Sequence, residues 1–417
     1  MTRKFWNCLG CLTLLAAVAP AQTLVSSGSV LASARQDPAV LQQTQQIALI
    51  QQTNLRLPFV EQVGLRTETD RFELRRQEYL TRVSVNGIKE MNSQRRLQSS
   101  NLNLEESKAQ VLLHEALLER YHILTEYRHA QREQDLRRQL ALVFEDKIQV
   151  LQTLARLNAD ADLEEIVKAE YDRDEQSLKI AATESRLEQL RLMIQQTVQP
   201  STTRWQLDTS DFISPQQVER VIGELPPSGL QNPELAEKQA KINQLDAEYR
   251  LKKAQSQQML DFFQMRYANR PDEPFNRDLS VGVGINLPYK GSARLNTNTL
   301  KIEQNAATQG VQRYQADLAQ WIELARRQIT ALSQRLQLAK QQWQDSQARF
   351  SLGQSAAAGS LGPMPLLKAR ELQIQRELNL LDIERDMFSQ YLKILDWTGH
   401  LSDTPAVNYL SANLGSY

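Results

Sequence analysis

The sequence predicts a mainly α-helical fold with a small β-sheet contribution, in which a strand pair is followed by a long antiparallel coiled-coil hairpin and the whole unit occurs twice. Three observations support this prediction. Apolar residues recur every seven positions over long stretches, and four short segments alternate in hydrophobicity with a period of two. Both features also appear in the same order in each half: Asp37 corresponds to Asn232, an offset of 195, and Arg156 corresponds to Arg349, an offset of 193. The chain is therefore interpreted as an internal duplication.

The segment 1–21 has the features of a secretory signal peptide. Arg3 and Lys4 precede an apolar run, and small residues at 19–21 form a cleavage site. Lipidation at Cys11 is the alternative, although Cys8 stands where an aliphatic residue is expected. The sequence has no other cysteine, so after cleavage the chain can form neither a disulfide nor a thiolate metal site.

Charge and hydropathy exclude two broad classes of protein. The 417 residues include 49 basic and 49 acidic side chains, so electrostatic attraction to nucleic acid is not expected. The mean hydropathy is −0.50. Beyond residue 22 no apolar run approaches the ~20 residues that a membrane-spanning helix needs. Contact with a membrane must therefore take another form.

The first repeat is expected at 22–198. A short helix begins at Asp37, a strand pair covers about 59–87, and a helical hairpin covers about 89–198 with its turn near 158–162. Its first arm contains no Pro or Gly between Lys89 and Asn158, so it could run for ~70 residues, or on the order of 100 Å. Its heptad rows are Leu136, Val143, Val150 and Leu157, then Ile180, Leu187 and Ile194.

A connector rich in Pro, Ser, Thr and Asp is expected at 199–231, followed by the second repeat at 232–399 and a tail at 400–417. The second repeat contains a helix, a strand pair at about 262–287 and a hairpin at about 292–396. Its heptad rows are Ile322, Ile329, Leu336, Trp343 and Phe350, then Leu318, Ala325, Leu332 and Ala339, then Leu367, Ile374, Leu381, Phe388 and Leu395.

The last predicted strand, 279–287, has one apolar and one small or polar face. Strands of this length can cross a bilayer when tilted. Four strands cannot close a barrel, and open edges are not tolerated in lipid, so several chains must pool their strands. Two copies would supply eight strands and a filled interior, whereas three would supply twelve, so a conducting pore favours three or more.

These features resemble the TolC-type outer-membrane efflux proteins. The motifs that carry the resemblance are the last strand with the residues that follow it, VGVGINLPYKGSARLNT, then ARFSLGQ before the second turn, PLLKAREL after it, and YLKILDWTGHL near the end. The resemblance implies a homotrimer with a short barrel in outer-membrane lipid and a helical tunnel in the periplasm. It also implies docking on a periplasmic adaptor and an inner-membrane pump, and export of substrate as the exit duct of a tripartite efflux or type I secretion system. Neither a catalytic residue nor a cofactor or metal is expected, and 199–231 would belong to an equatorial band.

Two sets of site residues follow from the resemblance and from the strand alternation. One set belongs to the hairpin tips, where Asp160 and Asp162 are candidate entrance acids or simply turn formers. The role of an insertion at 356–362 stays open. The adaptor-facing tip residues are Arg156, Leu157, Arg349, Phe350, Leu352, Gly353, Leu366 and Leu367. The lipid-facing strand residues are Leu279, Val281, Val283, Ile285 and Leu287, and the lumen-facing ones are Ser280, Gly282, Gly284 and Asn286.

Two alternatives to a channel stay open. A periplasmic adaptor also has a signal peptide and a helical hairpin, but it should carry one hairpin flanked by β-domains. A structural envelope protein without a pore would explain the heptads but not the four alternating segments. An enzyme is not supported: HEALLERYH lacks the second zinc-binding histidine at Leu118, and we expect His114, His122 and His129 to lie on the helix surface.

Overall fold

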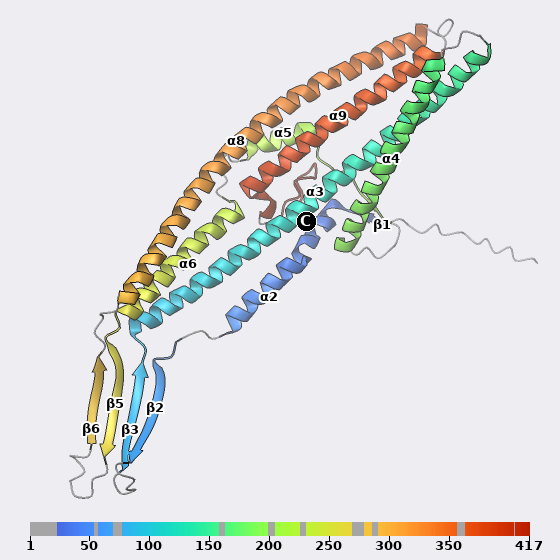
Figure 1. The fold of residues 1–417 in the computed structure, drawn as a ribbon. Helices are drawn as coiled ribbons and strands as arrows, with labels where there is room; N and C mark the ends of the chain where they lie inside the picture. The colour runs from blue at the N-terminus through green and yellow to red at the C-terminus, as the bar shows by residue number, and fades with distance from the viewer. Residues whose placement is uncertain are drawn as a thin grey trace, which may run out of the picture.

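The molecule is an elongated rod with a β-sheet at one end and the tips of two helical hairpins at the other (Figure 1). The computed structural model describes residues 23–53, 57–69, 77–157, 163–198, 205–225, 231–268, 279–285, 291–356, 363–403 and 405–417. Within the helix at 291–356 the side chains are described from Arg294 to Gln347. The predicted signal peptide lies outside the described residues.

The first repeat contains the longest helix. Helix α2 (Pro38–Gln52) leads to strands β2 (Val60–Thr69) and β3 (Gln77–Val85), and then to α3 (Ile88–Leu157), which has 70 residues. Helix α4 (Leu163–Val198) returns along α3. At 1.5 Å per residue α3 is about 105 Å long, as the absence of Pro and Gly predicts.

The second repeat has the same order of elements. Helix α6 (Pro233–Ser256) precedes β5 (Leu260–Ala268) and β6 (Leu279–Ile285), and then α8 (Gly291–Ala356) and α9 (Pro363–Thr398) form the second hairpin. Strand β5 begins slightly before its predicted start. The predicted fold class of two strand pairs and two long hairpins is confirmed, whereas one chain alone does not show how copies assemble.

Equivalent caps begin the two short helices. Asp37 Oδ1 accepts a hydrogen bond from the Ala39 amide at the start of α2, and Asn232 Oδ1 accepts one from the Leu235 amide at the start of α6. In both helices a proline follows the cap, where its missing N–H costs no helical hydrogen bond. The local signals that start these helices are thus repeated with the duplication.

The hairpins are held by the predicted heptad seams. The described apolar side chains of these rows are buried along most of both arms of the second hairpin. They are Leu318, Ile322, Ala325, Ile329 and Leu336 on α8, and Ile374, Leu381, Phe388 and Leu395 on α9. The two hairpins also pack on each other, because α3 lies against α9 as well as against α4.

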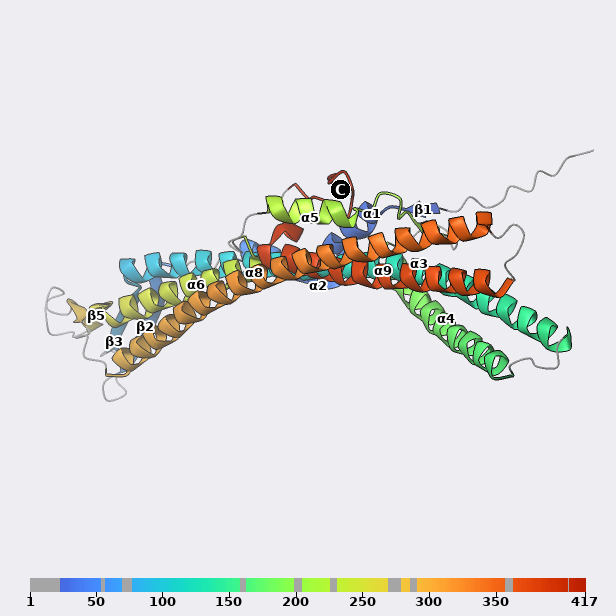
Figure 2. The ribbon, with the colours of Figure 1, turned by 90° about the horizontal axis from the view of Figure 1, so that it is seen from above.

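The main hydrophobic core lies at mid-length, where segments distant in sequence meet. Strand β1 (Thr23–Val25) pairs in parallel with β4 (Trp205–Leu207). Helix α1 (Ser27–Ala32), the 3-10 turn η1 (Ser33–Gln36) and helix α5 (Pro215–Glu224) of the connector join them, with η3 (His400–Ser402) and the tail. Figure 2 shows α1, β1, α5 and the C-terminal end on one side of the layer of long helices.

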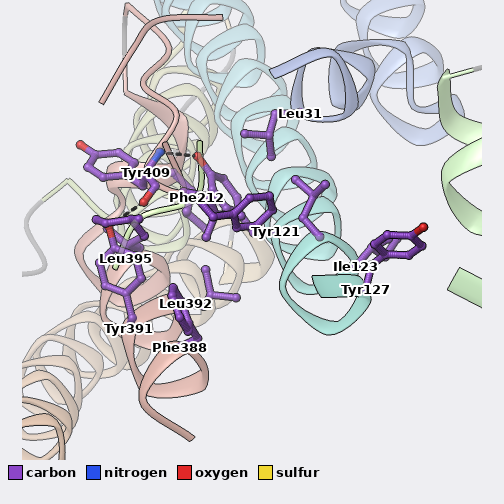
Figure 3. Packing of buried hydrophobic residues seen from close by; sticks show 14 of the residues in the cluster. Leu31, Tyr121, Ile123, Tyr127, Phe212, Phe388, Tyr391, Leu392, Leu395 and Tyr409 are labelled. Carbon is purple, nitrogen blue, oxygen red and sulfur yellow. Dashed lines mark hydrogen bonds between the residues drawn. The ribbon is translucent and has the colours of Figure 1, made fainter. Parts of the chain in front are cut away.

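Tyr121 of α3 is the centre of this core. Its side chain is fully buried, and its hydroxyl donates to the Val407 carbonyl at 3.1 Å and accepts from the Tyr409 amide at 3.1 Å. Figure 3 shows Tyr121 and Tyr409 joined in this way, with Tyr391 and Leu395 of α9 nearby. Burial raises the pKa of Tyr121, so the hydroxyl stays a neutral donor.

The helix α9 ends at a glycine that no other residue could replace without strain. Gly399 has φ of +82°, and a Cβ there would lie 2.3 Å from the Gln231 carbonyl oxygen. The close approach lets the Asn232 side chain donate to the carbonyls of Asp396 and Trp397. The start of α6 is thereby fixed to the end of α9.

The prediction that the α3 histidines lie on the helix surface is wrong for two of the three. His114 and His129 are each 5% exposed because α9 covers this face of α3, whereas His122 is exposed. Among the described residues, no group of three or more His, Cys, Asp or Glu side chains is arranged to hold a metal ion. No described helix is both long and apolar enough to cross a membrane.

Candidate functional site: the amphipathic sheet and the hairpin tips

The four strands form one antiparallel sheet in the order β2-β3-β5-β6, so the strand pairs of the two repeats join through β3 and β5. Figure 1 shows the sheet extending from the end of the helices. Strands β2 and β6 are its edges, and each has one side without a strand partner within the described residues. Such edges favour pairing with a further strand.

One face of the sheet is apolar. The pairing registers align the side chains in rows across the four strands, and many of them are exposed, such as Leu65 at 72% and Val281 at 74%. The rows are Val63, Val83, Phe263 and Val283; Leu65, Thr81, Met265 and Val281; and Thr67, Tyr79, Tyr267 and Leu279. A contiguous exposed apolar face of this kind indicates contact with lipid or with another protein.

The opposite face is polar and carries ion pairs. Arg82 lies 3.5 Å from Asp261, Arg266 donates through Nε to Glu78 at 2.9 Å, and Arg66 pairs with Glu68. These side chains are 25 to 72% exposed, so each pair contributes little to stability.

The two glycines of β6 make room for side chains of β5. A Cβ at Gly284 would lie 2.2 Å from Cε1 of Phe262, and one at Gly282 would lie 3.0 Å from Cγ of Gln264. The Phe262 ring thus covers Gly284 on the polar face, and the guanidinium of Arg82 lies 3.5 Å from the ring centroid. The sequence shows that the glycines alternate along the strand. Why glycine is needed at these positions becomes clear only from the register of β5 and β6.

The predicted strand residues occupy two faces in the structure. Leu279, Val281, Val283 and Ile285 are 40 to 74% exposed on one face. Ser280, Gly282 and Gly284 lie on the other face. Leu287 and Asn286 lie outside the described residues. Assignment of the two faces to lipid and lumen stays a prediction.

The hairpin tips lie at the far end of the rod from the sheet (Figure 1). Arg156 and Leu157 form the last turn of α3, where Leu157 is 75% exposed. Leu366 and Leu367 lie in the first turns of α9, and Leu367 packs against the small cluster that contains Phe144. Arg349, Phe350, Leu352 and Gly353 lie in the last turns of α8, but their side chains are not described. Asp160 and Asp162 lie outside the described residues.

An ion pair joins the two tips. Lys368 Nζ of α9 lies 2.7 Å from Glu165 of α4, and this contact lowers the pKa of Glu165 and raises that of Lys368. Further along, Lys147 of α3 lies 3.4 Å from Glu371 of α9. The sequence does not indicate either pair, because a heptad pattern identifies seam residues within a hairpin but not contacts between hairpins.

No family model matches the sequence, and no curated protein matches it. Solved structures do match its fold. The outer-membrane protein VceC of Vibrio cholerae superposes with a TM-score of 0.65 at 12% identity, over 89% of this chain and 96% of that chain. The open state of the MtrE outer-membrane channel of Neisseria gonorrhoeae gives 0.66 at 12% identity, over 89% and 88%. The CmeC outer-membrane channel of Campylobacter jejuni gives 0.53 at 11% identity, over 89% and 84%. The chain therefore has the fold of these outer-membrane proteins.

Proposed function

We propose that this chain, which has the fold of outer-membrane channels, is an outer-membrane channel-tunnel that exports substrates as the exit duct of a tripartite efflux or type I secretion system. It acts as a homotrimer, not as an enzyme. The observation that carries the proposal is the amphipathic sheet with two unpaired edges at the end of a helical rod about 100 Å long. The similarity of the fold to known channels supports it.

The apolar face of the sheet suits the lipid of the outer membrane, and the polar face suits a water-filled lumen. Strands of nine or ten residues reach roughly 30 Å, enough to cross the hydrocarbon layer when tilted. Tyr79 and Tyr267 stack at 6.5 Å where the strands end, as expected of an interfacial aromatic girdle. Leu279, Val281, Val283 and Ile285 then face lipid, and Ser280, Gly282 and Gly284 face the lumen.

The two strand pairs have the same register, so equivalent residues are paired in each. Val63 pairs with Val83 in the first pair, and Phe263 pairs with Val283 at the equivalent position of the second. A β-bulge follows Val60 in the first pair and Leu260 in the second, again at equivalent positions. The internal duplication is thus preserved down to individual strand registers.

This repetition predicts how the open edges pair. Inside the chain, Val83 of β3 pairs with Phe263 of β5. The equivalent of β3 in the second repeat is β6, and the equivalent of β5 in the first repeat is β2. Val283 of one copy should therefore pair with Val63 of a second copy, and Leu279 with Thr67. The apolar and polar faces would continue unbroken around the barrel.

The helices support the same assembly. Helix α3 packs against α2 of its own repeat and α6 of the other, whereas α8 packs against α6 and, among the described residues, not against α2. Leu295 and Ile302 of α8 are 68% and 70% exposed. The α2 face that would cover them in a second copy also exposes apolar side chains, Leu41 at 46% and Leu49 at 64%. Three copies would close the arrangement with twelve strands.

The hairpin tips are the expected docking site for a periplasmic adaptor, which couples the tunnel to an inner-membrane pump. The apolar side chains at the first tip support this assignment, because they are 41 to 75% exposed in the described part of the chain. They are Leu154, Leu157, Leu163 and Val167. A periplasmic adaptor or a pore-less envelope protein would not need the exposed apolar face of the sheet.

The test combines cross-linking with conductance. Apart from Cys8 and Cys11 the sequence has no cysteine, so Val63→Cys with Val283→Cys introduces a defined pair. Oxidation should give covalent trimers, and the trimers should conduct ions in planar bilayers. The control pair Val63→Cys with Leu279→Cys is displaced by four positions, or ~13 Å, and should not cross-link. A monomer without conductance would contradict the proposal; a conducting trimer without the cross-link would reject only the register.

A further inference from the structure

The two helical hairpins meet along a seam between α3 and α9 that contains histidines. His114 Nε2 lies 2.9 Å from Asp396 of α9. His129, about four turns further along α3, is 5% exposed and faces Asp382 and Arg385 of α9. The function proposed above assigns no role to either histidine.

His129 is buried without a satisfied hydrogen bond. Neither ring nitrogen has a partner of normal geometry. Glu133 Oε2 of its own helix lies 3.7 Å from Nδ1, and Asp382 Oδ1 lies 3.9 Å from Nε2. The Leu381 carbonyl also faces the ring. A buried imidazole without hydrogen bonds is costly to ionise, because charge is poorly solvated there.

Several arginine side chains lie close to His129. A pocket beside His129 is lined by Arg128 and Arg132 of α3 and by Arg385 of α9, with Phe212 of the connector at its wall. Arg132 pairs with Glu384 at 2.8 Å, and Arg385 donates two hydrogen bonds of 3.1 Å to Glu126. Arg128 forms no ion pair with a described carboxylate. A protonated His129 would add a further positive charge to this cluster.

The sign of the pH effect follows from these surroundings. Burial, and then Arg385, lower the pKa of His129, while Glu133, Asp382 and the Leu381 carbonyl oppose them. If α3 and α9 separate, water returns the imidazole toward its ordinary pKa of about 6.5. Between that value and the lower pKa of the packed seam, the separated state binds more protons. The packing is therefore fully stable above about pH 6.5 and weakens as the pH falls.

We propose that His129 makes the contact between the two hairpins sensitive to pH, so that acid loosens the α3–α9 seam and frees the hairpins to move apart. The device acts on the helical half of the rod and does not depend on ion conduction or on the assembly of the sheet. Protonation of this one buried group shifts the equilibrium between packed and separated hairpins toward the separated state.

Spin labels across the seam test the proposal. Leu142 of α3 and Leu372 of α9 are 66% and 46% exposed, and Gln139 and Arg370 nearby are within hydrogen-bond distance, so labels at these two sites report the helix separation. In the full-length chain in detergent, the label distance should lengthen between pH 7.5 and 5.0, with a midpoint below 6.5. His129→Gln, which cannot take up a proton, should hold the distance constant over this range.

Two charge variants and one control variant separate titration from a packing defect. Arg385→Gln removes the main opposing charge, which brings the pKa of His129 in the packed seam closer to that in the separated state, so the midpoint of separation should fall, with Glu126 still paired to Arg186. Asp382→Asn removes a favourable charge from the packed seam, which lowers the pKa of His129 there further, so the midpoint of separation should rise. His122→Gln, on the exposed rim of the same pocket, should leave most of the response intact. The proposal is overturned if the parent shows no change with pH, if His129→Gln keeps the change, or if the two charge variants shift the midpoint in the same direction.

Discussion

Replacing Gly284 of β6 by alanine should open the edge of the sheet. The added Cβ would lie 2.2 to 2.6 Å from three carbons of the Phe262 ring, whereas non-bonded carbons prefer about 3.5 to 4.0 Å. The ring must therefore move by more than about 1 Å. Overpacking of this kind costs about 1–3 kcal/mol. Moving the ring also breaks its contact with Arg82, which contributes about 0.5–1 kcal/mol.

These terms predict a local destabilisation of about 1.5–4 kcal/mol, which corresponds to a roughly 10- to 1,000-fold larger equilibrium constant for the opening of β6. Hydrogen exchange followed by mass spectrometry measures it, with peptides from β5 and β6 compared with an internal reference peptide from α3. The reference should not change, because α3 lies outside the sheet. Gly282→Ala is the matched control: its Cβ meets only the flexible Gln264 side chain at 3.0 Å, so its effect should be smaller.

The double variant Gly284→Ala with Phe262→Ala removes the clash and should recover most of the protection that Gly284→Ala loses. Unchanged exchange in Gly284→Ala, or a double variant that exchanges as fast as the single one, would show that the glycine does not make room for the ring.

Two other outcomes follow from the core and from the tip. Tyr121→Phe removes both hydrogen bonds of the hydroxyl and leaves a buried N–H and C=O unpaired, at a cost of about 2–5 kcal/mol, so proteolysis should release the 405–417 tail faster. Tyr391→Phe removes one hydrogen bond, to the Tyr409 carbonyl, and should have the smaller effect; the reverse order would contradict the role given to Tyr121. Leu157→Glu, at a side chain 75% exposed, should leave the thermal stability of the protein within about 0.5 kcal/mol of its original value but abolish export. Leu142→Glu on the same helix, 66% exposed and away from the tip, should export normally, and equal export by both variants would argue against docking at the tip.

The parts of the fold that sequence reasoning predicts are those with a local period. The row of Ile322, Ile329 and Leu336 is visible as a repeat of seven, and these side chains are buried in α8. The alternation of Leu279, Val281 and Val283 likewise identifies β6 and its exposed face. In both cases the face on which a residue lies is indicated by its neighbours on the same helix or strand.

The parts that escape sequence reasoning depend on contacts between distant segments. The burial of His129 is caused by α9, which belongs to the other repeat, and nothing in α3 itself distinguishes its environment from that of the exposed His122. The contact of Gly284 with Phe262 depends on a strand register. The mid-length core joins β1, the connector and the tail, none of which has a periodic pattern.

The meeting of Tyr121 with residues 407 and 409 has a consequence for biosynthesis. These partners are separated by 286 and 288 positions, so the middle of the rod cannot be completed until the segment with residues 407 and 409 has been made. The hairpins can form early from neighbouring residues, whereas the core that holds them together also needs residues 407 and 409. A chain interrupted before that point would leave the ring of Tyr121 and its apolar neighbours uncovered, a state that proteases and chaperones recognise. The same contact thus makes the closing of the mid-length core depend on synthesis of this distant segment.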